Sequence, residues 1–190
     1  MRRWLFPLLF GFVLAIVGYQ VGLAQFPRAL MTLATGRIAG ASGLGSLSAV
    51  LFGGSPGGER VNTLTAAPLA TDKARMIVRP SPDLAYSSCP FDLSRGPVLV
   101  DIQPVPAVYW SLSVFDARTD VAYVRNNIDA GGQPIRVAIA QEGQPVPDGM
   151  TAVRVKGSSG IALLRILVPD RSQFAPIDAA RKLSSCKPLS

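Results

Sequence analysis

The chain opens with a long apolar run. No residue from Trp4 to Val17 is charged or strongly polar, and uncharged residues continue to Pro27 behind the basic start Arg2-Arg3. This length exceeds the roughly 20 residues that cross a bilayer, which predicts a membrane anchor. The basic start, the apolar core and the small residues Gly22-Leu23-Ala24 also suit a cleavable signal peptide, although the length of the run favours the anchor. Residues 1–24 are therefore predicted to be a transmembrane anchor or a signal sequence.

Residues 25–60 form a second segment that is rich in small residues. Apolar positions at helical spacing predict a helix from about Arg28 to Ile38, with Pro27 in its first turn. These positions are Leu30, Leu33, Ala34, Ile38 and Ala41. The run Gly53–Gly58 has the composition of a linker. A membrane contact of residues 28–52 stays open, although Arg37 would need a partner inside a bilayer.

From residue 61 onward the pattern changes to short, β-branched and aromatic segments separated by Pro, Gly and Asp. In two of them apolar and polar residues alternate, as in Trp110–Val114, which indicates strands with one face in a core. A short helix is expected from Pro176 to Leu183. Residues 61–190 are thus predicted to form a mainly antiparallel β-sandwich with about seven strands: Ala74–Arg79, Val98–Gln103, Val108–Phe115, Ala122–Arg125, Ile135–Ala140, Thr151–Lys156 and Ile161–Val168.

The net charge of +7 bears on two possible partners, anionic lipids and nucleic acid. Residues 1–60 contain five Arg and one Glu, so much of the excess lies near the predicted anchor, where anionic headgroups attract it. No basic run with interleaved aromatic residues is present, so nucleic acid is not expected as a partner.

The chain has no histidine and two cysteines, Cys89 and Cys186. The missing histidine excludes Ser-His-Asp and Cys-His catalysis and zinc sites built on imidazole. Neither a metal nor another cofactor is predicted. Outside the cytoplasm the two cysteines can form a disulfide, but the sequence leaves two unpaired thiols equally open.

Two polar stretches are candidate ligand or partner contacts. The first contains Arg79, Asp83 and Tyr86 between prolines, and the second contains Asp116 and Asp120. The functional interpretation is a cleft between the Asp83–Tyr86 loop and the Asp116–Asp120 turn, in an enzyme or a small-ligand binder. The structural interpretation is that these aspartates accept backbone N–H bonds in turns and that the tyrosine packs its ring.

The first stretch also carries a resemblance. The pieces are Arg79-Pro80-Ser81-Pro82-Asp83-Leu84-Ala85-Tyr86-Ser87, then Asp92-Leu93-Ser94, then Pro97-Val98, Tyr109 and Asp116-Ala117-Arg118-Thr119. In order and spacing they resemble the bacterial family named domain of unknown function 1254. Relative to that family's pattern, Ser81 replaces an Asn, Leu84 a Thr, Val108 an Arg and Trp110 a Tyr. The resemblance implies an immunoglobulin-like β-sandwich, without a settled activity.

The resemblance also implies a location and a partner. The chain is similar to short, membrane-anchored members of that family, which are expected in the bacterial inner membrane with the sandwich on the periplasmic side. Longer members continue into a second β domain, named domain of unknown function 1214. For this chain, that domain is expected in a separate envelope protein. With no complete catalytic set, a protein-protein interaction is the expected function, and the enzyme or small-ligand binder is the alternative.

Overall fold

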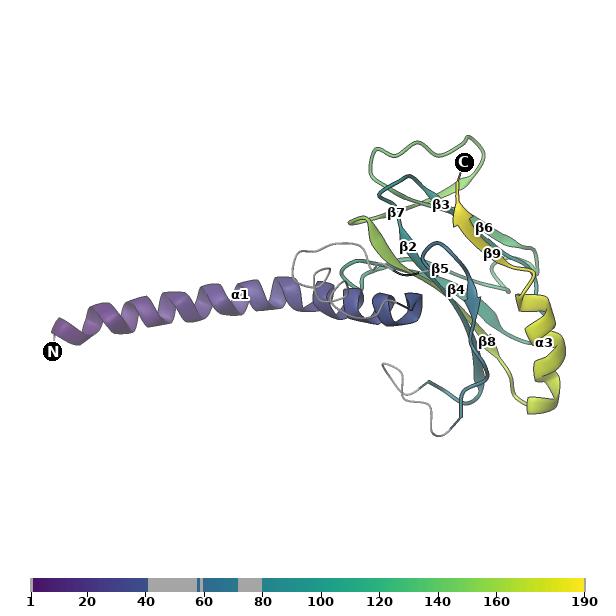
Figure 1. The fold of residues 1–190 in the computed structure, drawn as a ribbon, viewed down its shortest axis with the longest axis horizontal. Coiled ribbons are helices and arrows are strands. Elements are labelled where there is room, and N and C mark those ends of the chain that lie inside the picture. Colours follow the sequence, from purple (N-terminus) through teal and green to yellow (C-terminus); the bar gives the residue numbers. More distant parts are fainter. Residues whose placement is uncertain (1, 41–57, 59, 72–79, 190) are drawn as a thin grey trace.

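The computed structural model describes residues 2–40, 58, 60–71 and 80–189 (Figure 1). One long helix precedes a β-rich body that carries a short helix near its end. The elements in chain order are α1 (Arg2–Ala39), β1 (Thr65–Ala66), β2 (Leu84–Asp92), β3 (Val98–Ile102), β4 (Trp110–Asp116), β5 (Val121–Asn126), β6 (Ile135–Gln141), β7 (Thr151–Val155), β8 (Ser159–Leu167), the 3₁₀ turn η1 (Arg171–Gln173), α3 (Phe174–Arg181) and β9 (Ser185–Pro188).

The strands form two sheets, which confirms a mainly β fold. The first sheet has the order β1-β2-β8-β4-β5 and the second has the order β7-β6-β3-β9. All pairs are antiparallel except β6 and β7, which run parallel. The prediction of a mainly antiparallel sandwich is therefore confirmed, with β6 and β7 as the parallel pair among the described strands. Residues 142–150 connect the end of β6 to the start of β7, so that the two strands run in the same direction.

The core lies between the two sheets. Period-two alternation turns Trp110, Leu112 and Val114 of β4 inward, as their spacing predicts. They share one core cluster with buried residues of the second sheet such as Val100 and Ile139. Each fully buried aliphatic side chain of this kind contributes about 1.5–3 kcal/mol relative to an exposed one, so the cluster holds the two layers together.

The strands with clear alternation or a dense apolar run were predictable, and those with prolines were not. β3 to β8 each start and end within two residues of their predicted bounds. β2 was interpreted as a loop because Pro82 and Pro90 flank or interrupt it. Pro90 is tolerated in the strand because β1 pairs only with Ser87 and Ser88, so β2 is an edge strand at Pro90. β9 was also missed, and the predicted strand Ala74–Arg79 lies outside the described residues.

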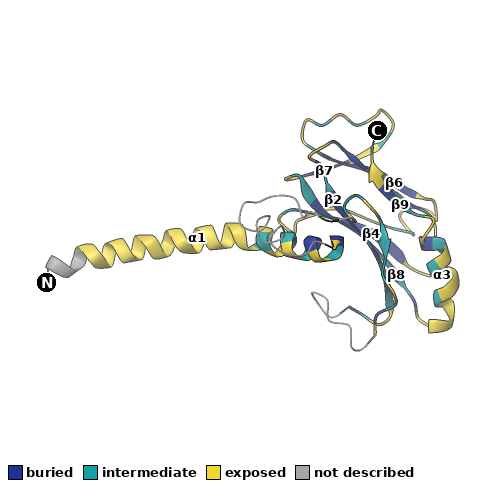
Figure 2. Ribbon diagram, viewed as in Figure 1, coloured by how far each residue is buried: buried dark blue, intermediate teal, exposed yellow. Residues whose placement is uncertain are grey.

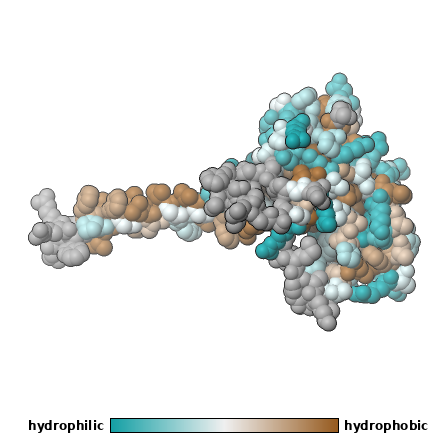
Figure 3. All heavy atoms as spheres, viewed as in Figure 1, coloured by the Kyte–Doolittle hydropathy of each residue, from teal (hydrophilic) through white to brown (hydrophobic). Residues whose placement is uncertain are grey.

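Helix α1 runs without a break across the boundary predicted at residue 24, and Pro27 lies inside it rather than in a first turn. Its N-terminal part projects from the body with exposed side chains, and its last turns are partly buried (Figures 1 and 2). Figure 3 shows that the projecting part is mostly hydrophobic. One helix of the described chain, Phe6–Ala39, is long and apolar enough to cross a membrane.

The end of α1 packs on β2 and β8. Its buried positions are Met31, Thr35, Gly36 and Ala39, whereas Leu30 and Leu33 of the predicted apolar face are 48% and 37% exposed. The predicted face is therefore wrong by about one position. Hydrophobicity alone does not mark the buried face, because two of its four positions, Thr35 and Gly36, are not strongly apolar.

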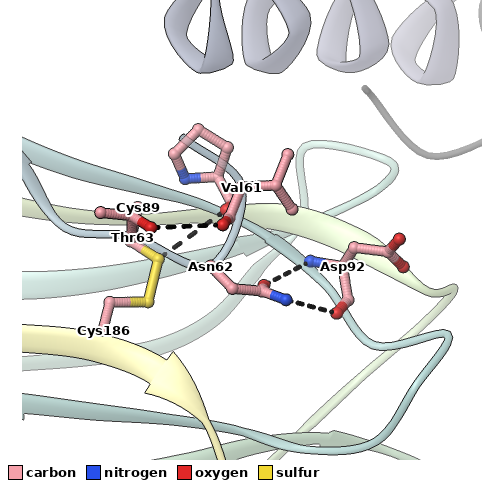
Figure 4. The surroundings of a disulfide bond; sticks show 7 residues. Val61, Asn62, Thr63, Cys89, Asp92 and Cys186 are labelled. Carbon is pink, nitrogen blue, oxygen red and sulfur yellow. Dashed lines mark hydrogen bonds between the residues drawn. A yellow bond between two sulfur atoms is a disulfide. The ribbon is translucent and has the colours of Figure 1, made fainter. Parts of the chain in front are cut away.

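Gly58 and Arg60, which precede the sandwich in the chain, contact the backbone at the end of α1. The Arg60 N–H donates to the Ala39 carbonyl, and a Cβ added at Gly58 would collide with the Ala39 backbone. Asn62 has a left-handed conformation with φ 57°. Its side chain exchanges two hydrogen bonds with the Asp92 backbone (Figure 4). These contacts seat the helix end beside the C-terminal end of β2.

We expect Gly160→Ala to destabilise the sandwich. A Cβ at this position would collide with the Phe115 carbonyl oxygen and with the Phe91 ring. Overpacking of this kind costs about 1–3 kcal/mol, so the Tm of the detergent-solubilised full-length protein should fall by several degrees. Ser159→Ala, at the neighbouring half-buried position, is the matched control. Equal Tm values for the two variants would contradict this packing.

Candidate functional site

The two loops predicted to share a cleft lie at opposite ends of the first sheet. Leu84, next to Asp83, pairs with Leu167 at the end of β8, and Asp116 pairs with Gly160 near its start. The seven residue steps from Gly160 to Leu167 along β8 correspond to about 23 Å, which exceeds the span of one small-ligand pocket. The prediction of a common site for Asp83, Tyr86, Asp116 and Asp120 is therefore wrong.

Asp116 shapes the turn between β4 and β5. Its side chain is buried, and its Oδ1 accepts hydrogen bonds from the backbone N–H groups of Arg118 and Asp120. Thr119 has a left-handed φ of 69°, which this bonding supports. The side chains of Arg118 and Asp120 are exposed. The arrangement matches the structural interpretation of this stretch.

The Asp83–Tyr86 stretch begins β2. Tyr86 is half-buried, and its Oη accepts a hydrogen bond from the Ser81 N–H, so the preceding turn folds back on the tyrosine. Asp83 is exposed, and its carbonyl accepts a bond from the Val168 N–H. Arg79, the third candidate in this stretch, lies outside the described residues.

Cys89 and Cys186 are joined by a disulfide, with 6.4 Å between their Cα atoms (Figure 4). Cys89 is in β2 of the first sheet and Cys186 is in β9 of the second. The bond therefore crosses the core and closes a loop over a sequence separation of 97. Sequence spacing left the pairing open because it does not show which strands face each other.

Arg181 is a buried arginine that the sequence pattern did not mark. It lies in α3 with 1% of its surface exposed. Its Nη1 donates to the Tyr86 carbonyl and its Nη2 to the Ala67 carbonyl, so it ties α3 to the pairing of β1 and β2. Asp178 accepts bonds from its Nε and Nη2, and the Phe174 ring lies 5.3 Å from the guanidinium. This arginine therefore has a structural role.

An exposed apolar strip follows the free edge of the first sheet and was also missed. β5 is the last strand in its sheet, and Val121 and Val124 on it are 58% and 55% exposed. Near its end, Val108 and Ile128 are 78% and 73% exposed. Asn127 holds these two segments together, because its side chain bonds to the Trp110 N–H and to the Val108 carbonyl.

This strip, Val108, Val121, Val124 and Ile128 with the partly exposed Tyr109, is the candidate functional site. Among the residues that the structure describes, no strand pairs with the outer edge of β5. β5 does approach β7 of the second sheet. The described residues also contain no cluster of acids and cysteines able to hold a metal ion. An apolar strip beside unpaired backbone N–H and C=O groups suits a protein partner.

We expect the disulfide to contribute about 2–5 kcal/mol to the free energy of unfolding, because it restricts the unfolded chain over a long loop. A reducing agent should therefore lower the stability of the wild-type protein in chemical denaturation. The double variant Cys89→Ala, Cys186→Ala should start at this lower stability and show no further change. Equal wild-type stability with and without the reducing agent would contradict the assignment.

A second expectation concerns acid stability. The hydrogen bond from Lys182 lowers the pKa of Asp178, as do the hydrogen bond and charge of Arg181, and partial burial opposes them. A folded-state pKa below the unfolded value of about 3.9 stabilises the fold above that pH, and the stabilisation is lost as pH falls through the folded pKa. Asp178→Asn should therefore be less stable than wild type at pH 7 and match it near pH 2.

Thermal unfolding across this pH range measures the difference. Asp148→Asn, a change of the same kind at an exposed loop position, is the control and should track wild type throughout. A constant gap between wild type and Asp178→Asn from pH 2 to pH 7 would show that the ion pairs are not its source.

Comparisons with known proteins bear on the fold. The pattern of the family described as "Protein of unknown function (DUF1254)" matches residues 61–188. The VPA0106 protein from Vibrio parahaemolyticus, of known structure, is similar over 90% of this chain with a TM-score of 0.58 and 15% identity. An uncharacterized protein from Burkholderia cenocepacia is similar over 67% of this chain and 34% of its own, with a TM-score of 0.45 and 14% identity.

The chain spans 38% of the length of the Vibrio protein. No curated protein matches it in sequence. The likeness to the Vibrio protein supports the β-rich fold, and the family match covers the whole sandwich.

Proposed function

The chain belongs to the DUF1254 family, and from this premise we propose that it is a membrane-anchored cell-envelope protein whose sandwich binds a second protein. In this proposal α1 crosses the bacterial inner membrane, and the sandwich lies on the periplasmic side. The Arg2-Arg3 start favours an N-terminus on the cytoplasmic side. The disulfide suits an oxidising compartment outside the cytoplasm.

The exposed length of α1 supports the anchor in this proposal. Its exposed apolar residues run from Phe6 to Leu30, which is long enough for a bilayer of about 30 Å. The turns that follow are packed on β2 and β8, with Met31 and Thr35 buried. Cleavage after Ala24 would remove most of the exposed part of α1 and leave its packed end in place. In the uncleaved protein the continuous helix joins the membrane-spanning part to the packed end and so holds the sandwich close to the membrane.

The single observation that carries the interaction is the apolar strip on β5. An edge strand with open backbone groups can accept a strand from a partner, and the flanking valines and isoleucine supply apolar contact area. The proposed partner is a separate envelope protein that carries the domain of unknown function 1214. That partner is a β protein by the resemblance, so it has strands and edges of its own to pair.

The test is co-purification of the full-length, tagged protein with that partner from detergent-solubilised membranes. Val124→Glu and Ile128→Glu place charges in the strip and should each reduce partner recovery about tenfold or more, equivalent to about 1.4 kcal/mol. Leu183→Glu changes an equally exposed apolar residue outside the strip, 74% exposed, and should leave recovery unchanged. Wild-type recovery in the two strip variants would overturn the assignment of the strip.

A further inference from the structure

The outer face of the first sheet carries a row of polar side chains across four strands. Tyr86 of β2 pairs with Arg165 of β8, Arg165 pairs with Ser111 of β4, and Ser111 pairs with Asn126 of β5. Directly paired residues point to the same face of a sheet. Their neighbours Leu112 and Leu164 are in the core between the sheets, so this row points the other way, toward the face on which the end of α1 packs.

The residues at the centre of this row are buried, and two of their polar atoms have no hydrogen-bond partner. Ser111 and Ser113 are each 1% exposed, and the Ser111 Oγ has no hydrogen-bond partner. The Nε of Arg165 is buried and also lacks one, while its Nη2 donates to the Ser113 Oγ over 3.3 Å. Among the described residues no carboxylate pairs with Arg165. Buried groups in this state are costly and usually have a partner, here one that the described chain does not supply.

The flanking polar side chains do not supply hydrogen-bond partners for Arg165 and Ser111. The Tyr86 Oη already accepts from the Ser81 N–H, and the Asn126 Oδ1 accepts from the N–H groups of Ile128 and Asp129. The half-buried Leu163 and Phe115 on the same face have no side-chain acceptor. The groups that can still bind a ligand are therefore the positive charge and N–H donors of one guanidinium and two serine hydroxyl groups, all on neighbouring strands.

We propose that Arg165, Ser111 and Ser113 bind a single oxyanion group on this face. A guanidinium binds phosphate or carboxylate oxygens through two parallel hydrogen bonds, and serine hydroxyls donate to further oxygens. The phosphate group matches this donor set in charge and in number of oxygens. It has two sources: a free phosphate, or a phospholipid headgroup beside α1, whose packed end lies on the same face.

Binding is measured as thermal stabilisation of the full-length protein in neutral detergent. Inorganic phosphate is compared with chloride at equal ionic strength, and a saturating ligand raises Tm by about 5 °C for a chain of this size. The lipid arm compares the protein in neutral detergent with and without added phosphatidylglycerol, whose headgroup carries the phosphate. Stabilisation by free phosphate assigns a soluble ligand, and stabilisation by phosphatidylglycerol alone assigns the headgroup; either result supports the site.

The variants separate this site from the general effect of phosphate on folded proteins. The double variant Ser111→Ala, Ser113→Ala keeps the arginine and the sheet packing, and it should lose most of the ligand-dependent rise. Arg165→Met should lose all of it. Arg136→Met removes an exposed arginine that pairs with Asp101 in the second sheet, and it should keep the full rise.

Two results would overturn the proposal. One is the absence of stabilisation by either probe in the wild-type protein. The other is an equal rise in the wild type and in the double serine variant. If Arg165→Met does not fold, the serine variant still decides between these outcomes, because both serines are small and their replacement leaves no large cavity. The result does not depend on the partner proposed for the β5 strip.

Discussion

β8 pairs along its whole length with β2 on one side and with β4 on the other. This double pairing sets the register of the first sheet, and most other features follow from it. It separates the Asp83 end of the sheet from the Asp116 end. It turns Leu164 and Ile166 into the core and Arg165 onto the outer face, where α1 packs. A shift of one residue would exchange these faces and bury the arginine in the core.

Two cross-links join the elements around that sheet. The Cys89–Cys186 disulfide ties it to the second sheet through β9, and buried Arg181 ties α3 to the backbone of β1 and β2. Both connect segments about 100 residues apart. The first sheet is thereby held on its inner face by the core and the disulfide. Its free edge at β5 carries the exposed apolar strip, and its outer face carries the buried polar row.

Much of the fold was predictable because its signals are local. Alternation in Trp110–Val114 and the apolar run in β8 mark strands by themselves, since a strand shows its two faces within a few residues. β2 lacks such a signal because prolines are typical of loops. Pro90 is tolerated within the strand because β1 pairs only with Ser87 and Ser88. The candidate site was less predictable. Val124 and Ile128 resemble core residues in sequence, and their exposure depends on β5 being an edge strand.

By itself the sequence determined a hydrophobic N-terminal helix, a β-rich domain after residue 61, and the absence of histidine chemistry. These properties depend on composition and on periods of two to four residues, which each segment carries alone. The tertiary structure decided that Asp83 and Asp116 lie apart, that Cys89 meets Cys186, and that Arg165 faces two buried serines. Each of these depends on which strands pair and in what register, and the pairing free energy comes from residues far apart in the chain.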